Sequence, residues 1–300
     1  MPDSPASPTP YEILGVAATA SQAELRRAYR RLLRETHPDT GGSPARFHAV
    51  QRAWERIGDP TARSAWDNGH PARGAEEAPS AQSARRPEGS SLRARSYGHP
   101  GGQARERFLG LMREWAGRGS ALPDPYDAAL VRSAPREIRH LLADALAEEA
   151  TARAVSTLGI GYTIWNGVQA ANGRIDHVVL GPAGLFAIMS EDWGSGLRIV
   201  RGELEGDGLE PGEMPVRALS RRARALGRAL RVRFTTMLIV VPDDSLAEAV
   251  ALIGRKGDLA VVRLSVLPKL LRDGIGKGER LSIESVFDVR TRLQQGIRFV

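Results

Sequence analysis

The stretch "ELRRAYRRLLRETHPDTGG", residues 24–42, decides the fold of the N-terminal part of the chain. Its apolar residues recur every three or four positions, which predicts an amphipathic helix with arginines on its other faces. These residues are Leu25, Ala28, Tyr29, Leu32 and Leu33. Ser21 and Glu24 have the spacing of a capping box that starts this helix. Pro38 disfavours helical geometry in its predecessor and lacks an N–H group, so the helix should end near His37.

A second helix is expected to begin at Ser43, where a capping side chain is followed by a proline in the first turn. Its buried side should be formed by Phe47, Val50, Trp54 and Ile57. Two amphipathic helices joined by a short loop pack antiparallel, so residues 37–42 should project from one end of a helical hairpin. Asp59 and Pro60 predict a third, short helix that carries Trp66.

These segments, together with "YEILGV" at 11–16, "FHAVQRAWERIGDP" at 47–60 and "RSAWD" at 63–67, resemble a J domain from end to end. The resemblance implies docking onto a DnaK-type chaperone and stimulation of the ATPase of that partner. It implies a contact signature of His37, Pro38 and Asp39, and a positive face of Arg26, Arg27, Arg30 and Arg31. Thr36 and Trp66 stand where the J-domain family usually has tyrosine.

The composition limits the chemistry that the chain can perform. The 300 residues include no cysteine, which excludes disulfides, thiolate zinc sites and a cysteine nucleophile and suits a cytoplasmic location. Residues 1–9 are polar and rich in proline, so we expect a disordered tail and no secretory signal. No apolar run approaches the roughly 20 residues of a membrane span, so no membrane partner is expected. The net charge of +7 makes nucleic acid or an acidic protein surface a plausible partner.

The pattern along the chain predicts several domains: an all-α J domain at 10–69, a flexible linker at 70–102, a connecting helical segment at 103–134 and an α/β domain at 135–300. The α/β domain should contain helices at 136–159 and 219–233, and strands at 162–168, 174–181, 185–190, 197–200, 235–242 and 259–264. Glycines 181 and 184 predict a hairpin turn, and the helix before the strand at 235–242 predicts a crossover connection.

The segment "GRIDHVVLGPAGLFAIMSEDWGSG", residues 173–196, resembles the nuclease-related domain, a branch of the restriction-endonuclease-like PD-(D/E)XK fold with a mixed sheet. The resemblance implies a divalent metal site made by a helix acid, a strand acid and an acid-x-lysine pair on the next strand. The helix acid falls on Glu149 and the strand acid on Asp176, but the pair falls on Met189 and Glu191.

This departure from the pattern argues against catalysis. A thioether is a poor magnesium ligand, and a carboxylate in place of an ammonium group reverses the local charge. We therefore expect a non-catalytic pseudo-nuclease that needs no metal and no cofactor, and that directs the J domain to a target. The alternative is a metal-dependent nuclease or DNA-binding protein that uses the J domain for recruitment.

The segment from Pro215 to Pro242 is a second basic region, with seven arginines and no acidic residue. Four of them are candidate contacts for the phosphates of DNA or RNA: Arg221, Arg222, Arg224 and Arg228. A helix face that is simply solvated has the same sequence pattern, so both interpretations stay open.

Overall fold

The computed structural model describes residues 4–38, 41–68, 93–117, 124–254, 257–275 and 280–300. These residues form two compact units. The helical unit contains residues 7–68 and 124–135 of the described chain, and the α/β unit contains residues 4–6, 93–117 and 136–300. The predicted fold class, helical hairpin followed by an α/β domain, is confirmed.

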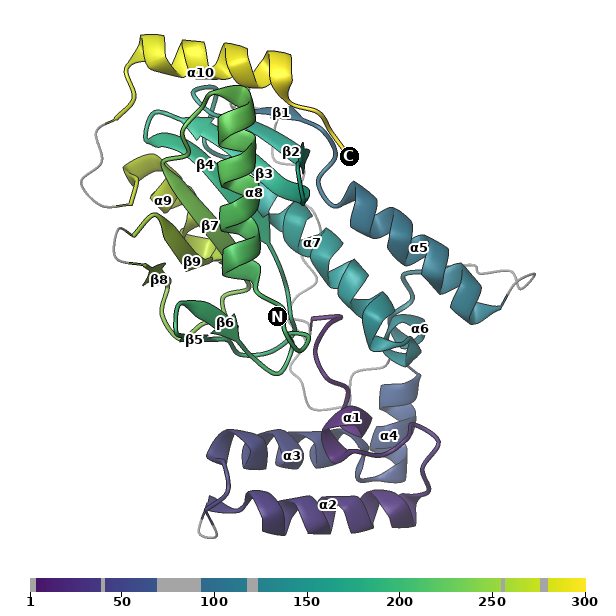
Figure 1. Cartoon of the computed structure of the whole chain (residues 1–300). Helices are drawn as coiled ribbons and strands as arrows, with labels where there is room; N and C mark the ends of the chain where they lie inside the picture. The colour runs from purple at the N-terminus through teal and green to yellow at the C-terminus, as the bar shows by residue number, and fades with distance from the viewer. Residues whose placement is uncertain (1–3, 39–40, 69–92, 118–123, 255–256, 276–279) are drawn as a thin grey trace, which may run out of the picture. The chain divides into compact units, whose positions relative to one another are not determined.

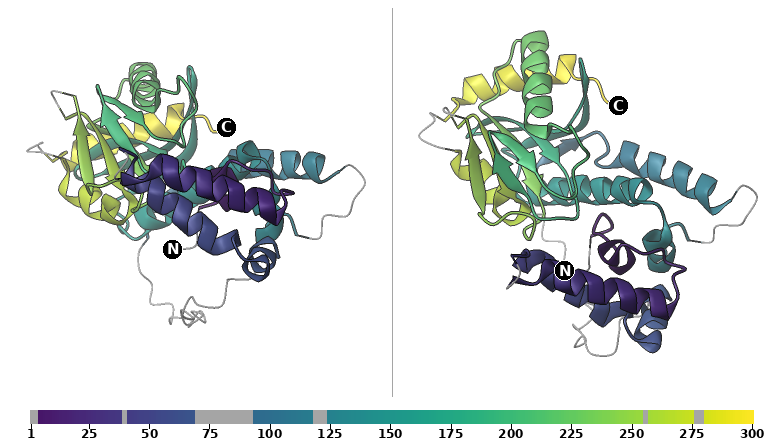
Figure 2. Two further views of the ribbon diagram at one scale, coloured as in Figure 1. Left: turned by 90° about the horizontal axis from the view of Figure 1, so that it is seen from below. Right: turned by 60° about the horizontal axis from the view of Figure 1, so that its bottom comes forward.

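The helical unit is built on two long helices that lie side by side (Figures 1 and 2). The predicted capping box starts α2, since the Ser21 side chain accepts from the Glu24 N–H group while the Glu24 carboxylate accepts from the Ser21 N–H group. The helices are α1 (Pro10–Leu14), α2 (Gln22–Thr36), α3 (Pro44–Ile57), α4 (Pro60–Asp67) and α6 (Ala128–Ser133).

The core of the helical unit forms where the predicted apolar faces meet. Leu25 of α2 and Ile57 of α3 are completely buried, and Leu14 of α1 closes the cluster. The ring of Tyr29 stacks on that of Trp54, with centroids 4.5 Å apart. Helix α6 joins this unit through Arg132, whose guanidinium lies 5.0 Å from the centroid of the Trp66 ring.

The α/β unit contains a seven-stranded mixed sheet in the order β1-β2-β3-β4-β7-β9-β8. Strands β2, β3 and β4 are antiparallel neighbours, whereas β4, β7 and β9 run parallel, and β8 is antiparallel to β9. The bounds are β1 (Arg95–Tyr97), β2 (Thr163–Ala170), β3 (Gly173–Gly181), β4 (Gly184–Ser190), β7 (Thr236–Val241), β8 (Val250–Ile253) and β9 (Leu259–Arg263). A separate hairpin pairs β5 (Arg198–Val200) with β6 (Glu203–Glu205).

Helices cover both faces of this sheet (Figure 1). On one face, α8 (Pro215–Leu230) and α10 (Ile283–Gly296) pack on the larger apolar cluster. On the other, α7 (Arg136–Ser156) and α9 (Leu267–Asp273) pack on the second cluster, and α5 (Gly102–Ala116) lies against α7. Helix α8 connects the parallel strands β4 and β7, so the predicted crossover and the predicted hairpin between β3 and β4 are confirmed.

The expected domain boundaries need adjustment at three places. The last part of the expected linker forms β1, an edge strand of the sheet, while residues 69–92 lie outside the described residues. The expected connecting segment divides, because α5 belongs to the α/β unit and α6 to the helical unit. Residues 4–6 of the expected tail belong to the α/β unit, where Ala6 is buried and the Pro5 carbonyl accepts a hydrogen bond from Arg139.

Candidate functional sites

The first candidate site is the loop between α2 and α3, where Pro38 ends the first helix. His37 caps α2 in an extended conformation with ψ 130°, which the following proline favours. The loop then turns back, since the Gly42 N–H group donates to the His37 carbonyl and the Gly41 N–H group donates to the Pro38 carbonyl, both at 3.0 Å. Gly41 supplies the positive φ of 85° that this turn needs.

The side chains of this loop differ in their exposure. The His37 ring is half-buried and meets the Phe47 ring edge-on, with centroids 5.2 Å apart, while Pro38 is exposed. Asp39 lies outside the described residues. Thr36, at the position where tyrosine is usual, is buried and its hydroxyl donates to the Leu32 carbonyl at 2.7 Å. The loop therefore presents Pro38 to solvent on a base that Thr36 and Phe47 hold in place.

Helix α2 presents a positive surface next to this loop. The four arginines expected there are all exposed: Arg26, Arg27, Arg30 and Arg31. Arg31 also forms a solvent-exposed ion pair with Glu35 at 3.8 Å, which contributes little to stability. Most of the positive charge on this face is thus available to an acidic partner surface.

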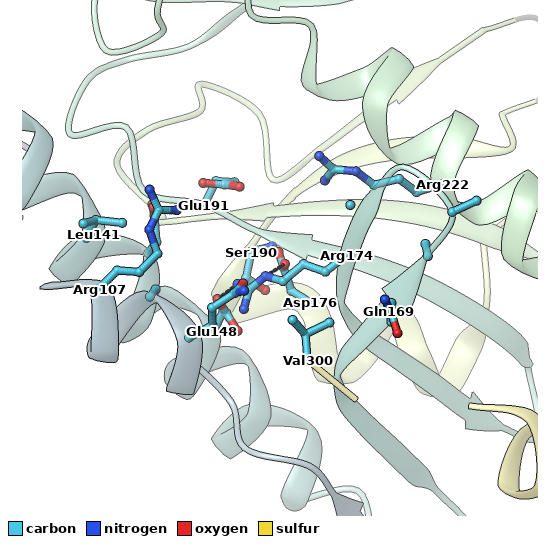
Figure 3. Close-up of a pocket in the computed structure, with 16 residues that line it drawn as sticks. Arg107, Leu141, Glu148, Gln169, Arg174, Asp176, Ser190, Glu191, Arg222 and Val300 are labelled. Atoms are coloured by element: carbon cyan, nitrogen blue, oxygen red, sulfur yellow. Dashed lines mark hydrogen bonds and ion pairs between the residues drawn. The ribbon is translucent and has the colours of Figure 1, made fainter. Parts of the chain in front are cut away.

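The second candidate site is a pocket of about 570 Å³ in the α/β unit, between α5, α7 and the ends of β2, β3 and β4 (Figure 3). Its walls carry both signs of charge. The acids are Asp144, Glu148, Asp176 and Glu191, and the bases are Arg107, Arg174 and Arg222. Such a mixture in a concave site suits recognition of a polar ligand rather than an apolar one.

Arg174 lies between two buried acids at the centre of the pocket (Figure 3). Its guanidinium forms ion pairs with Oε1 of Glu148 and, at 3.3 Å, with Oδ1 of Asp176. The other oxygen of each acid accepts from the backbone, Glu148 from Gly101 at 2.9 Å and Asp176 from Ser190 at 2.8 Å. Burial raises the pKa of Asp176, and the charges of Arg174 and Arg222 oppose that rise.

Asp144 and Glu191 form a second acid pair, joined by a hydrogen bond between their side chains. Burial raises the pKa of Asp144 to about 7, and the hydrogen bond from Glu191 limits this rise. Burial, followed by the negative charges of Asp144 and Asp176, raises the pKa of Glu191 well above its usual range. The hydrogen bond between the two carboxyl groups needs a proton on one of them, so they titrate as a pair.

The structure brings together only part of the set expected for a nuclease. Asp176 and Glu191 line the pocket, but Met189 points into the apolar cluster on the other face of the sheet, together with Leu219 and Leu226 of α8. Glu149 also lies outside the pocket, where it accepts from Arg105 of α5 at 2.9 Å. The acid that α7 places in the pocket is Glu148, one residue earlier.

Sequence reasoning missed Glu148 because α7 is buried on two sides. Glu149 follows the row of Ile138, Leu142 and Ala145, which are buried at spacings of three and four. Glu148 instead shares a face with Thr151 and Val155, and this face packs on the sheet, where Thr151 accepts from the Ser190 hydroxyl at 2.9 Å. The signal available in the sequence was the position of Glu148, three residues before Thr151 and seven before Val155, which places all three on one face of the helix.

A divalent metal does not fit between Glu148 and Asp176 in this arrangement. Their converging oxygens are already neutralised by the Arg174 guanidinium, and the position where a lysine is expected holds Glu191, whose pKa burial raises well above its usual range. Within the described ranges of the chain, no group of three His, Cys, Asp or Glu residues is placed to hold a metal ion.

The basic region of α8 divides between two surfaces. Arg222 is half-buried, lines the pocket and donates to the Asn172 carbonyl at 3.4 Å. The other arginines repeat at spacings of four, three, four and three along the exposed face of the helix. This arginine row consists of Arg217, Arg221, Arg224, Arg228 and Arg231, all exposed.

Two family models match the chain. The DnaJ domain model matches residues 9–67, and the nuclease-related domain model matches residues 143–242. Both resemblances seen in the sequence are therefore confirmed. Strand β1, α5 and the start of α7 precede the second match, although they belong to the same compact unit and α5 lines the pocket.

Three curated relatives illustrate the match of the first domain. A DnaJ protein homolog of Cucumis sativus is 46% identical over 57 residues, 19% of this chain and 14% of the relative. The chaperone protein DnaJ of Thermosynechococcus vestitus is 48% identical over 60 residues, 19% of this chain and 16% of the relative. A tetratricopeptide repeat and J domain-containing co-chaperone of Mycosarcoma maydis is 42% identical over 59 residues, 20% of this chain and 10% of the relative.

The chain thus spans no more than 16% of the length of any of these three proteins, and the likeness concerns one domain of each. No helix in the described part of the chain is both long enough and apolar enough to cross a lipid bilayer. The chain contains a DnaJ domain at residues 9–67 and, after it, a nuclease-related domain at residues 143–242.

Proposed function

We propose that the chain is a J-domain co-chaperone that binds a DnaK-type chaperone and stimulates its ATPase. The observation that carries this proposal is the loop 37–42 beside α2, with Pro38 and four arginines exposed on adjoining surfaces. A row of arginines accelerates encounter with an acidic surface and fixes its orientation, because opposite charges steer association. The carboxylate of Asp39 then makes the charge-assisted contact that the J-domain signature implies.

The test is ATP hydrolysis by a cognate DnaK-type protein, measured with the full chain. The wild type should accelerate hydrolysis, and Asp39→Asn should remove the acceleration. Asp59→Asn is the matched control, since Asp59 caps α4 through the Thr61 and Ala62 N–H groups and asparagine caps a helix equally well. Equal stimulation by wild type and Asp39→Asn, or none by the wild type at saturation, would contradict the proposal.

The nuclease-related domain, in this proposal, selects the target without cleaving it. Support comes from Met189, which is part of the apolar core, and from Glu191, which is paired with Asp144. A cleavage assay on plasmid and linear DNA with magnesium or manganese should show no turnover. Turnover that disappears in Asp176→Asn would instead assign the domain as a nuclease.

A second candidate function is binding of a nucleic-acid backbone by the arginine row of α8. Within α8 the row runs from Arg217 to Arg228, which are 11 residues apart, so this part extends over roughly 17 Å at 1.5 Å per residue. In the described part of the chain, no acidic side chain forms an ion pair with the row, whereas Arg292 of α10 pairs with Asp288. Uncompensated arginines in one line favour a polyanion over a mixed protein surface.

Two charge-reversal variants separate the two candidate functions. Arg221, Arg224 and Arg228 changed together to Glu should weaken duplex DNA binding and reduce the slope of log K against log salt by about 2 to 3. The matched control changes Arg26, Arg27 and Arg30 to Glu, the same change in net charge on α2. This control should keep the slope of log K against log salt for duplex DNA and should lose ATPase stimulation. Equal effects of both variants on DNA binding would mean that net charge, rather than the arginine row, determines the binding.

A further inference from the structure

The buried carboxylates of Glu148 and Asp176 each direct one oxygen at the same place in the pocket, and the guanidinium of Arg174 occupies that place. Glu148 is fully buried and Asp176 nearly so. One oxygen of each acid accepts from a backbone N–H group, that of Gly101 for Glu148 and that of Ser190 for Asp176. The other oxygen of each acid pairs with Arg174. The backbone bonds fix the orientation of both carboxylates, so the two remaining oxygens form a rigid pair of acceptors.

We propose that Arg174 is an internal substitute for a divalent cation, and that its guanidinium closes the pocket of the nuclease-related domain to metal. This inference rests on the proposed non-catalytic role of that domain, and it names the group that occupies the place of the metal ion. A guanidinium is planar, stays protonated and presents its N–H groups as a fork, which matches two fixed carboxylate oxygens. A hard cation would need these same oxygens, so metal and Arg174 exclude one another.

Charge balance explains why the arginine is needed. Two buried carboxylates without a cation are unstable, because their mutual repulsion adds to the loss of hydration. Arg222 also lines the pocket, but its Nε donates to the Asn172 carbonyl at 3.4 Å, whereas Arg174 pairs with both acids. Removal of the charge of Arg174 should therefore leave Glu148 and Asp176 with oxygens that recruit a cation from solution.

The experiment compares manganese binding by the wild type and by Arg174→Met, which keeps an unbranched chain and removes the charge. Calorimetric titration with Mn²⁺ should show no pocket binding by the wild type and binding of one ion by Arg174→Met. Manganese at a hundred times its dissociation constant should raise the melting temperature of the variant by about 5 to 10 °C. Adding Asp176→Asn to Arg174→Met should abolish both effects.

Arg105→Met is the matched control. Arg105 of α5 pairs with Glu149, which lies on α7 next to Glu148 but outside the pocket. This variant should bind no more manganese than the wild type. Manganese bound by the wild type and lost in Glu148→Gln would overturn the inference, as would a folded Arg174→Met that binds none. The wild-type titration decides the matter alone if Arg174→Met does not fold.

The outcome is distinguishable from a failure of the proposed function. A wild type that binds no manganese yet cleaves DNA would refute the non-catalytic role and leave the metal-free pocket standing. A wild type that binds manganese in the pocket without cleaving DNA would refute the inference about Arg174 and leave the non-catalytic role standing.

Discussion

The phenol of Tyr11 donates a hydrogen bond of 2.8 Å to Oδ1 of Asp67, which lies 56 residues further along the chain. Arg63 completes the group, since its Nε donates to the Tyr11 hydroxyl at 3.0 Å and its guanidinium lies over the Tyr11 ring. These contacts join α1 to α4, so the first and last helices of the DnaJ domain hold each other in place. Burial and the bond to Asp67 raise the pKa of Tyr11 to about 12.

Tyr11→Phe should therefore lower the stability of the helical unit by about 1 kcal/mol, the net value of one hydrogen bond. The phenol must be protonated to donate. Because the folded-state pKa is raised, its contribution is complete below pH 10 and is lost as the pH rises through about 12. Urea unfolding followed by circular dichroism at pH 8 and pH 11 should show a smaller loss in Tyr11→Phe than in the wild type. Equal losses would mean that Tyr11 does not titrate as described.

Gly42 gives a test of the loop 37–42 that leaves the signature residues unchanged. A Cβ atom at this position would lie 2.2 Å from the Thr36 carbonyl carbon, and backbone cannot yield as a side chain does. Gly42→Ala should cost about 1 to 3 kcal/mol and displace the loop. We expect reduced ATPase stimulation even at temperatures where α2 and α3 remain folded by circular dichroism.

Gly110→Ala is the control for Gly42→Ala. Gly110 lies within α5, and no atom lies within 4 Å of its added Cβ, so alanine should stabilise the helix by about 0.5 to 1 kcal/mol. A Gly42→Ala variant that stimulates the ATPase as the wild type does would show that the loop tolerates displacement at this point.

The DnaJ domain was predictable because its signals are local. Ser21 and Glu24 start α2, Pro38 ends it, and Asp59 accepts from the Thr61 and Ala62 N–H groups to start α4. Each of these effects acts within four residues, so the sequence contains the information without knowledge of the tertiary structure. The stacking of Tyr29 on Trp54 follows from the predicted antiparallel pairing of the two helices.

The pocket was predictable only in part because its geometry depends on long-range packing. Asp176 was found from its motif, but Arg174 was not considered, since its role depends on Glu148 of α7, 26 residues earlier. Strand β1 was assigned to the linker because three residues with exposed side chains have no apolar period, although their backbone pairs with Thr163 to Trp165 of β2. Contacts of this kind are absent from any short window of sequence.

His177 predicts how the α/β unit responds to acid. It is completely buried, its Nδ1 lies 2.8 Å from Oδ1 of Asn166, and burial lowers its pKa to about 3. A histidine with a lowered pKa contributes stability that is present above pH 6.5 and is lost as the pH falls towards 3, at about 1.4 kcal/mol per pH unit. His177→Asn places an amide near the position of Nδ1 and should show a weaker loss of urea stability between pH 6.5 and pH 4.5. A pH profile parallel to the wild type would exclude His177 as the source.

Asp144 should have the opposite effect over part of the same range. Its pKa is raised to about 7, first by burial and then by the charge of Asp176, while Glu191 and Arg174 oppose the rise. A carboxyl group with a raised pKa contributes stability that is complete below pH 3.8 and is lost as the pH rises through about 7. Asp144→Asn removes the ionisation and should be more stable than the wild type at pH 8, with an advantage that disappears by pH 4.

The urea midpoint at pH 4 and pH 8 measures this difference directly. Glu149→Gln is the control, since this acid of α7 pairs with Arg105 outside the pocket and its removal should bring no gain at pH 8. A gain in Asp144→Asn confined to alkaline pH would locate the unfavourable charge in the pocket, where the side chains of Asp144 and Glu191 are joined by a hydrogen bond. A loss of stability of Asp144→Asn at pH 8 would contradict this prediction. It would mean that the ionised Asp144 accepts the hydrogen bond of Glu191 and that this charged hydrogen bond stabilises the fold.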